Sequence, residues 1–224
     1  MRPALSFSFL PGIAYSRGLE LMEEAARMLS GGHAASLLMF EHTPSITLGV
    51  RTAASSVLLA DDELARRGIT CYRTDRGGDA TWHGPGQLTG YPVVDLKTLG
   101  LTVPAYVGAL ETAIMEWLEE RGAQAVRIKG RPGVWMNGRE KIASIGVRVS
   151  NGVATHGFAL NLCGPMPGSD AIVPCGLRGV RLVTLESARG PVVKPAEAAP
   201  GVAARLASAL GMELSVQVRK DPET

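Results

Sequence analysis

Two residues in the sequence are of types that carry nucleophilic catalysis. Cys175 lies between Pro174 and Gly176, where a stiff backbone and a small successor leave a thiol open to a bulky substrate. Lys141 opens an alternating apolar segment that ends at Val149, and an ammonium on an apolar face is costly unless it is paired or deprotonated. If the two side chains meet, the ammonium favours the thiolate, which is the nucleophilic form of cysteine.

Both residues also have a structural interpretation that the local sequence leaves open. Buried free cysteines are mostly small core residues, and a lysine on an edge strand can extend its ammonium to water. His156 alternates with Phe158 and Leu160, so it is either a hydrogen-bonded core histidine or part of a pocket wall. The spacing of His156, Cys163 and Cys175 matches none of the usual zinc ligand sets, so no metal site is expected.

A glycine-rich segment, residues 76–87, is the densest signal in the chain. It holds four glycines and one proline, which predicts a loop whose backbone approaches a ligand closely. Neither GxxxxGK[ST] nor GxGxxG occurs in the sequence, so the common phosphate-binding loops are not indicated. A tight structural turn with a hydrogen-bonded histidine is the alternative.

Composition limits the classes of protein to which the chain can belong. Its 224 residues carry 23 Lys and Arg against 21 Asp and Glu, a net charge of +2, which argues against a nucleic-acid binder. No apolar run approaches the roughly 18 residues of a membrane span, and Ser6 and Ser8 interrupt the apolar N-terminus that a secretion signal needs. Three cysteines without CxxC spacing favour a reducing cytoplasm.

The elements that position these residues are predicted to form one α+β domain over residues 1–224. Apolar residues at helical spacing predict helices over residues 16–30, from Thr102 to a stop at Gly122, and after Pro195. Strands are expected over residues 37–41, 69–74, 91–96 and 125–128. Two turn signals, Asn137-Gly138 and Ser150-Asn151-Gly152, predict hairpins, the second returning over residues 153–161. Helices between antiparallel hairpins are typical of an α+β sheet with helices packed on it.

Taken together, the motifs resemble those of the lipoyl(octanoyl) transferase family. The resemblance spans most of the chain and rests on motifs that occur in the family's order and at compatible spacing: residues 76–92, 133–135, 141–146, 156–161 and 172–176. It implies the catalytic-domain fold of biotin and lipoate protein ligases, a mixed β-sheet flanked by helices. The segment 162–171 departs from the family's aromatic and acidic pattern, and we interpret its Cys163 as structural.

The resemblance implies an ATP-independent acyl transfer that needs no cofactor. Cys175 would attack the octanoyl thioester of an acyl carrier protein, and a lysine of a lipoyl domain would then attack the octanoyl-enzyme. Lys141 would lower the pKa of the nucleophile and could shuttle protons, with the acid-base and purely electrostatic roles both open.

The resemblance also assigns a substrate pocket, with His156 in a supporting position. Its lining is expected to comprise Arg76, Gly77, Gly78, Asp79, Ala80, Thr81, Trp82, His83, Ser144, Ile145, Gly146, Gly157, Phe158 and Ala159.

The partners implied are octanoyl-acyl carrier protein as donor and lipoyl domains as acceptors. The acceptors belong to 2-oxoacid dehydrogenase complexes and to the H protein of the glycine cleavage system, with no nucleic acid or membrane involved and the enzyme a monomer. Because the carrier is acidic, we expect it to dock on a basic stripe formed by Arg127, Lys129, Arg131, Arg139, Lys141 and Arg148. A charged, solvated strand edge is the alternative.

Three other activities fit parts of the pattern. An ATP-dependent lipoate or biotin ligase shares the fold but needs no nucleophilic cysteine. A silent acyl-binding protein would need neither Cys175 nor Lys141, and a cysteine hydrolase would let water intercept the thioester. ATP dependence separates the ligase from the transferase.

Overall fold

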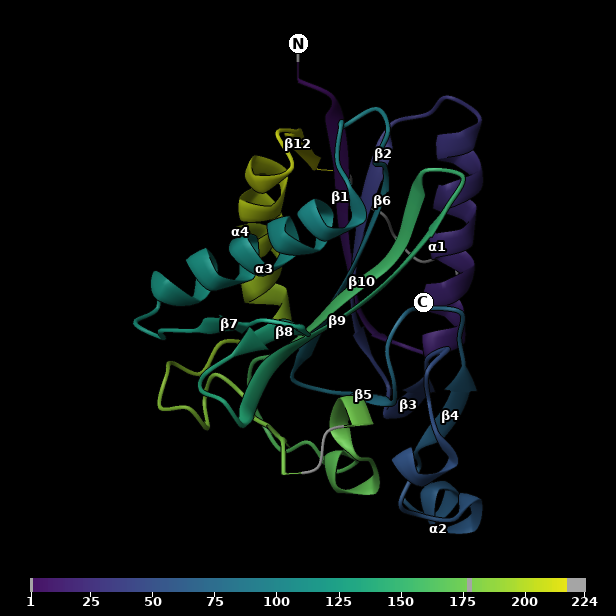
Figure 1. Cartoon of the computed structure of the whole chain (residues 1–224), viewed down its shortest axis with the longest axis vertical. Helices are drawn as coiled ribbons and strands as arrows, with labels where there is room; N and C mark the ends of the chain where they lie inside the picture. Colours follow the sequence, from purple (N-terminus) through teal and green to yellow (C-terminus); the bar gives the residue numbers. More distant parts are fainter. Residues whose placement is uncertain (1, 177–178, 217–224) are drawn as a thin grey trace.

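The computed structural model describes residues 2–176 and 179–216, apart from the side chains of Cys175 and Val216. Its main element is a mixed sheet, seen in Figure 1, in which β1 and β2 run parallel and the strands from β2 to β7 pair antiparallel. The strand order is β12 (Glu213–Val216), β1 (Ala4–Ile13), β2 (Ala35–His42), β6 (Gln87–Asp95), β10 (Val153–Asn161), β9 (Glu140–Ser150), β8 (Arg131–Trp135) and β7 (Val126–Ile128). β11 (Arg181–Leu182) pairs with β9 beside this path.

Helices cover both faces of this sheet. α3 (Val103–Glu119) and α4 (Pro195–Ala209) share one buried core with the sheet, which includes Trp117, Leu206 and Leu37. α1 (Tyr15–Ser30) packs on the opposite face, where Met22 joins a second core with Phe40. The α+β architecture expected from the sequence is confirmed (Figure 1).

A smaller three-stranded sheet adjoins the main one. It has the order β4 (Thr70–Arg73), β3 (Ser45–Leu48) and β5 (Thr81–His83), and α2 (Asp61–Arg66) packs beside it. Its own core contains Trp82, Ile46 and Leu64. Three short 3₁₀ turns also occur: η1 (Ala54–Ser56), η2 (Ser169–Ala171) and η3 (Pro174–Gly176).

Local sequence explains several element boundaries. The Thr102 side chain accepts a hydrogen bond from the Ala105 N–H at 3.3 Å, which caps α3 as expected. Asn151 and Gly152 take φ values of 53° and 94°, the positive angles that a two-residue hairpin turn requires between β9 and β10. β10 spans the residues predicted for the returning strand.

The prediction of the glycine-rich segment as a loop throughout was wrong. Residues 81–83 form β5, and β6 begins at Gln87, four residues before the predicted strand start. Strand β5 pairs with β3, a partner that no local pattern in residues 76–87 indicates. Within the described part of the chain, no helix has the length and apolar character needed to cross a bilayer.

Candidate functional site

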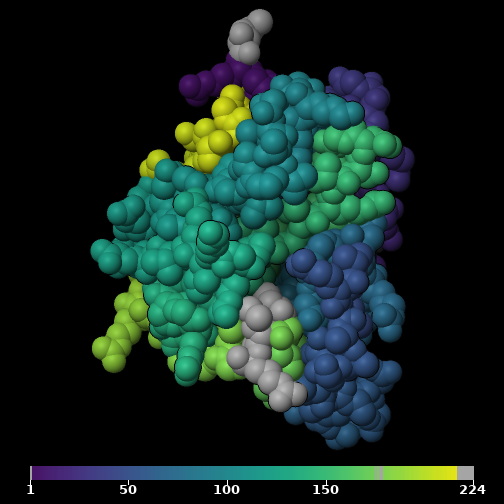
Figure 2. Space-filling model, viewed as in Figure 1, coloured from purple at the N-terminus to yellow at the C-terminus, as the bar shows by residue number. Residues whose placement is uncertain are grey.

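A cavity of about 290 Å³ opens where the small sheet meets β9 and β10. Figure 2 shows this face of the molecule hollowed between the blue segment and the teal segment. The cavity volume is near the lower end of the range for small-molecule sites, roughly 300–1,000 Å³, and suits a short chain. Its lining comes from distant segments: Tyr15, Arg51, Arg76, Gly78, Asp79, Ala80, Thr81, His83, Thr89, Tyr91, Gly130, Arg131, Pro132, Trp135, Lys141, Ser144, Ile145, Gly146, His156, Gly157, Phe158 and Ala159.

Most of the predicted pocket residues therefore border one cavity, with two exceptions. Trp82 is fully buried in the core of the small sheet, because β5 alternates and turns Thr81 and His83 to the cavity and Trp82 away from it. Gly77 also lies outside the lining, and its N–H donates to the Val147 carbonyl at 2.9 Å.

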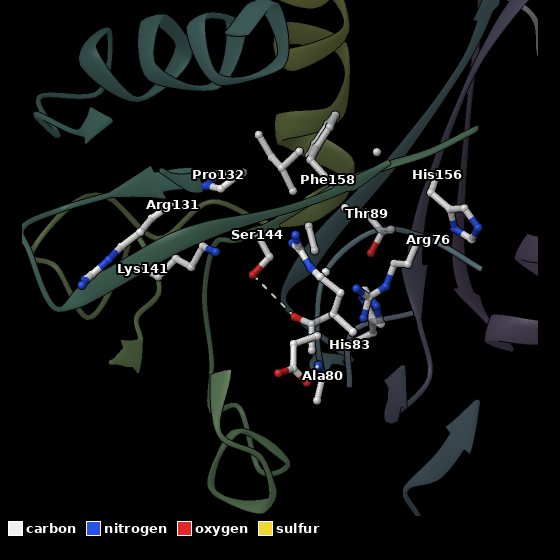
Figure 3. Close-up of a pocket in the computed structure, with 18 of the residues that line it drawn as sticks. Arg76, Ala80, His83, Thr89, Arg131, Pro132, Lys141, Ser144, His156 and Phe158 are labelled. Atoms are coloured by element: carbon white, nitrogen blue, oxygen red, sulfur yellow. Dashed lines mark hydrogen bonds between the residues drawn. The ribbon is translucent and has the colours of Figure 1, made fainter. Parts of the chain in front are cut away.

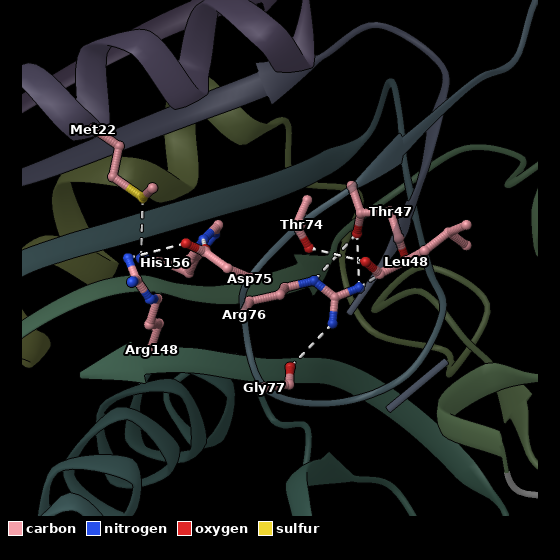
Figure 4. A network of polar contacts seen from close by, with 9 residues as sticks. All are labelled: Met22, Thr47, Leu48, Thr74, Asp75, Arg76, Gly77, Arg148 and His156. Carbon is pink, nitrogen blue, oxygen red and sulfur yellow. Dashed lines mark hydrogen bonds and ion pairs between the residues drawn. The ribbon is translucent and has the colours of Figure 1, made fainter. Parts of the chain in front are cut away.

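The buried Arg76 guanidinium fixes the glycine-rich segment against the small sheet. Its Nη2 donates to the Thr47 carbonyl at 2.8 Å and to Thr47 Oγ1 at 2.7 Å, and Nη1 donates to the Gly77 carbonyl at 3.1 Å (Figure 4). A Cβ at Gly146 would lie 2.6 Å from the Gly77 carbonyl oxygen, so β9 needs a glycine where this segment crosses it. Arg76 is thus part of the frame of the cavity as well as of its lining.

His83 is hydrogen-bonded on both ring nitrogens. Nδ1 lies 2.8 Å from Gln87 Oε1 and Nε2 lies 3.1 Å from Thr47 Oγ1, while the ring stacks on Tyr15 with centroids 5.2 Å apart. Burial lowers the pKa of His83 well below its usual value, and neighbouring His42 and Arg76 act in the same direction. His83 is therefore neutral and contributes a polar surface to the cavity wall.

His156 belongs to a second polar network behind the cavity. Its Nε2 lies 2.9 Å from Asp75 Oδ1, and Arg148 Nη1 lies 2.9 Å from Asp75 Oδ2 (Figure 4). Its backbone takes φ 55°, a left-handed conformation uncommon outside glycine, at the point where β10 faces Pro92, which has no N–H to donate. His156 both lines the cavity and anchors the bend that presents Gly157, Phe158 and Ala159.

Lys141 is buried, with 2% of its surface exposed, and reaches the cavity from β9. Figure 3 shows Lys141 and Arg131 at one side of the cavity and Arg76 and His156 at the other. The Lys141 Nζ lies 4.9 Å from the centroid of the Trp135 ring, within reach of a cation–π interaction. Burial of this lysine agrees with the expectation from its apolar surroundings.

The Lys141 side chain packs directly against Gly133. A Cβ at Gly133 would overlap Lys141 Cε and lie 3.0 Å from Nζ, and its φ of 125° disfavours any other residue. Helix α3 holds this glycine through Glu111, whose Oε1 accepts the Gly133 N–H at 2.9 Å while Oε2 pairs with Arg127 Nε at 3.0 Å.

The segment that carries Cys175 adjoins the cavity. Its backbone lies in η3, and a Cβ at Gly176 would meet the carboxylate of the cavity residue Asp79. The side chain of Cys175 lies outside the described part of the structure, so its pairing with Lys141 stays a prediction.

Five of the six basic residues of the expected docking stripe are exposed, and the sixth is not. Lys141 is buried, Arg127 pairs with Glu111, and Arg148 pairs with Asp75. Of the remaining three, Arg131 borders the cavity. Lys141 therefore does not belong to an exposed stripe, and docking of the carrier on the five exposed residues stays a prediction.

Several lining residues were not among the predicted site residues. Tyr91 and Trp135 lie within motifs that carried the family resemblance, so the signal for them was present. Tyr15 and Arg51 reach the cavity through tertiary packing, and no local pattern marks them.

The histidines near the cavity make stability depend on pH. Burial lowers the pKa of His42 to about 4, so between about pH 6.5 and 4 the unfolded chain binds a proton that the folded protein does not. Stability therefore falls as the pH falls through this window, and His42 alone should remove about 2–3 kcal/mol of unfolding free energy by about pH 4.5. Urea unfolding at a series of pH values should give a shallower pH slope for His42→Gln than for wild type. The exposed His33→Gln should keep the wild-type slope, and equal slopes for all three proteins would contradict the assignment to His42.

Comparison with known proteins identifies the family. The model of the lipoyl protein ligase A/B catalytic domain family matches residues 14–207. An octanoyltransferase of Leifsonia xyli subsp. xyli is 40% identical over 207 residues, which cover 90% of this chain and 89% of that protein. The chain belongs to the octanoyltransferase family. This octanoyltransferase is accordingly an enzyme of the transferase class, and the family predicted from the motifs is confirmed.

Solved structures confirm the fold expected for an octanoyltransferase. A lipoate-protein ligase A bound with ATP superposes with a TM-score of 0.74 at 18% identity, over 99% of this chain and 90% of that one. The biotin protein ligase of Aquifex aeolicus has a TM-score of 0.50 at 13% identity, over 94% and 70% of the two chains. These likenesses show the shared fold alone.

Proposed function

We propose that this octanoyltransferase moves an octanoyl group from octanoyl-acyl carrier protein to Cys175, and from Cys175 to the lysine amine of a lipoyl domain. The acceptors are the lipoyl domains of 2-oxoacid dehydrogenase complexes and the H protein of the glycine cleavage system. We take residues 1–224 as one catalytic domain that works in the cytoplasm, where thiols stay reduced.

The observation that carries the proposal is a narrow cavity with a buried lysine at one side and the Cys175 segment beside it. Lys141 lines the cavity, and a Cβ added at Gly176 would meet the carboxylate of Asp79 in the same lining. A cation near the thiol favours the thiolate, and the thiolate attacks a thioester without activation by ATP.

In the first step the Cys175 sulfur, having given up its proton, bonds to the thioester carbonyl carbon, and the bond from that carbon to the carrier's sulfur breaks. The carrier's sulfur takes up one proton in exchange, so the carrier leaves as a thiol. The apolar side chains of Ile145 and Phe158 and the small residues Gly146, Gly157 and Ala159 leave room for the acyl chain. Each buried methylene contributes about 0.8 kcal/mol, so the chain supplies much of the binding free energy.

Intact mass of the purified wild-type protein, mixed with octanoyl-acyl carrier protein without ATP, tests this function. We expect one octanoyl adduct, which a lipoyl domain then discharges while gaining the octanoyl group itself. The carrier without its acyl chain should give no adduct.

The ligase alternative predicts a different result from the same proteins. A wild-type protein that forms no adduct, and modifies the lipoyl domain only when octanoate and ATP are both present, would be a ligase. Turnover of octanoyl carrier to free octanoate in place of transfer would indicate a hydrolase.

A further inference from the structure

The charges around the cavity are mostly of one sign. Arg51, Arg76, Arg131 and Lys141 line it, and Asp79 is the one carboxylate among the lining residues that the structure describes. A lysine that enters from a lipoyl domain brings a further ammonium into this field. Like charges repel strongly where water is excluded, so the incoming ammonium needs an anion near the reacting carbon.

Asp79 is held where it meets that need. Its Oδ1 accepts the Ala80 N–H at 2.6 Å, which fixes the carboxylate on its own loop. The loop is fixed in turn, since the Arg51 N–H donates to the Gly78 carbonyl at 3.0 Å. The other oxygen, Oδ2, lies close to Gly176, the residue after Cys175, since a Cβ added at Gly176 would overlap it.

We propose that Asp79 receives the ammonium of the acceptor lysine in the second half of the reaction. The inference rests on the proposed function and gives Asp79 a part beyond lining the acyl pocket. Asp79 is half-buried, so it faces the cavity while remaining in reach of a side chain that arrives from solvent. Lys141 would repel the same ammonium. Lys141 therefore acts in the first half of the reaction, with the donor, and Asp79 acts in the second half, with the acceptor.

The step balances without a further reactant. The Asp79 carboxylate takes one proton from the bound ammonium and passes it to solvent, which leaves a neutral amine. The amine nitrogen bonds to the thioester carbon, the bond from that carbon to the Cys175 sulfur breaks, and the nitrogen gives up a second proton to that sulfur. The products are the octanoyl amide, the free enzyme thiol and one proton in solution.

The test is Asp79→Asn, which keeps an oxygen for the Ala80 N–H and removes the charge. Intact mass separates the two halves of the reaction. Relative to wild type, discharge of the adduct by a lipoyl domain should slow by at least about tenfold more than formation of the octanoyl adduct does. Discharge by hydroxylamine, which is uncharged at neutral pH, should match wild type.

Two further variants make the result specific. Asp79→Ser also offers an oxygen to the Ala80 N–H without charge and should behave like Asp79→Asn. Asp62→Asn on α2 removes the same charge from an exposed site with 78% of its side chain accessible, and should transfer at the wild-type rate.

Equal discharge of the Asp79→Asn and wild-type adducts by the lipoyl domain would overturn the inference. So would equal slowing of the lipoyl domain and hydroxylamine reactions, or loss of adduct formation in both Asp79 variants. A wild-type protein that forms no adduct would instead overturn the proposed function.

Discussion

Replacing Cys175 with alanine should abolish the octanoyl adduct and lower kcat/KM for octanoyl transfer by at least about 10⁴-fold. The nucleophile in a covalent mechanism has no substitute, and only binding and orientation of the two substrates would remain. The measurement is intact mass of the variant after incubation with octanoyl-acyl carrier protein, together with the rate of lipoyl domain modification.

The other two cysteines are matched controls. Burial raises the pKa of the Cys163 thiol, and the neighbouring Glu186, Glu41 and Glu197 act in the same direction. Burial and nearby Asp61 likewise raise the pKa of Cys71. Because less thiolate means a weaker nucleophile, Cys163→Ala and Cys71→Ala should keep the adduct and the activity. An adduct on Cys175→Ala that disappears in Cys163→Ala would move the nucleophile to Cys163.

Replacing Lys141 with methionine should lower kcat/KM by at least about 100-fold, the lower range for loss of a group that moves protons or stabilises charge. Methionine keeps much of the volume of the buried side chain, so packing against Trp135 changes less than charge does. The pH at which iodoacetamide alkylates Cys175 should rise in the variant, because the thiol loses a cationic neighbour.

The exposed Lys97→Met is the control, and it should keep the wild-type rate and alkylation profile. An unchanged alkylation profile for Lys141→Met, with a lowered rate, would leave Lys141 a role in proton transfer and contradict its effect on the thiol.

The packing of Lys141 against Gly133 provides an independent test of the role of the Lys141 ammonium. Gly133→Ala inserts a Cβ against Lys141 Cε and should displace the ammonium, whereas a Cβ at Gly138 meets no atom within 4 Å. In a double-mutant cycle, Gly133→Ala should reduce activity in the wild-type background and much less in Lys141→Met. Additive effects would show that the glycine acts on stability alone.

Local patterns predicted the elements that depend on local interactions. The helices α1, α3 and α4 follow from apolar spacing, and the β9–β10 hairpin follows from Asn151-Gly152. In β1, Phe7 and Phe9 alternate with Ser6 and Ser8, which is a strand pattern. In the sequence the two serines served only as evidence against a secretion signal, and this strand was not predicted. Both serines are buried, and Ser6 Oγ bonds to the Ala35 carbonyl, because β1 is covered on both faces.

The candidate site was also predicted only in part, where local sequence motifs specify it. Four of the five family motifs contribute residues to one cavity, and the fifth, residues 172–176, adjoins it beside Asp79. Trp82 points away from the cavity because successive side chains of β5 point in opposite directions. The sequence did not predict strand β5. Arg51 is positioned by the Gly78 carbonyl, a contact between segments that no single stretch of sequence encodes.

The pairing of β1 with β12 bears on how the chain folds as it is made. β1 lies between β2 and β12, and Ala4 pairs with Glu213, more than 200 positions further along the chain. During synthesis β1 is made long before β12, so its outer hydrogen-bonding groups lack this partner until Glu213–Val216 has emerged. An unpaired strand edge is prone to join another chain, and closing so long a loop is entropically slow. We infer that nascent chains truncated before Glu213 carry an open sheet edge and are the species most in need of chaperones.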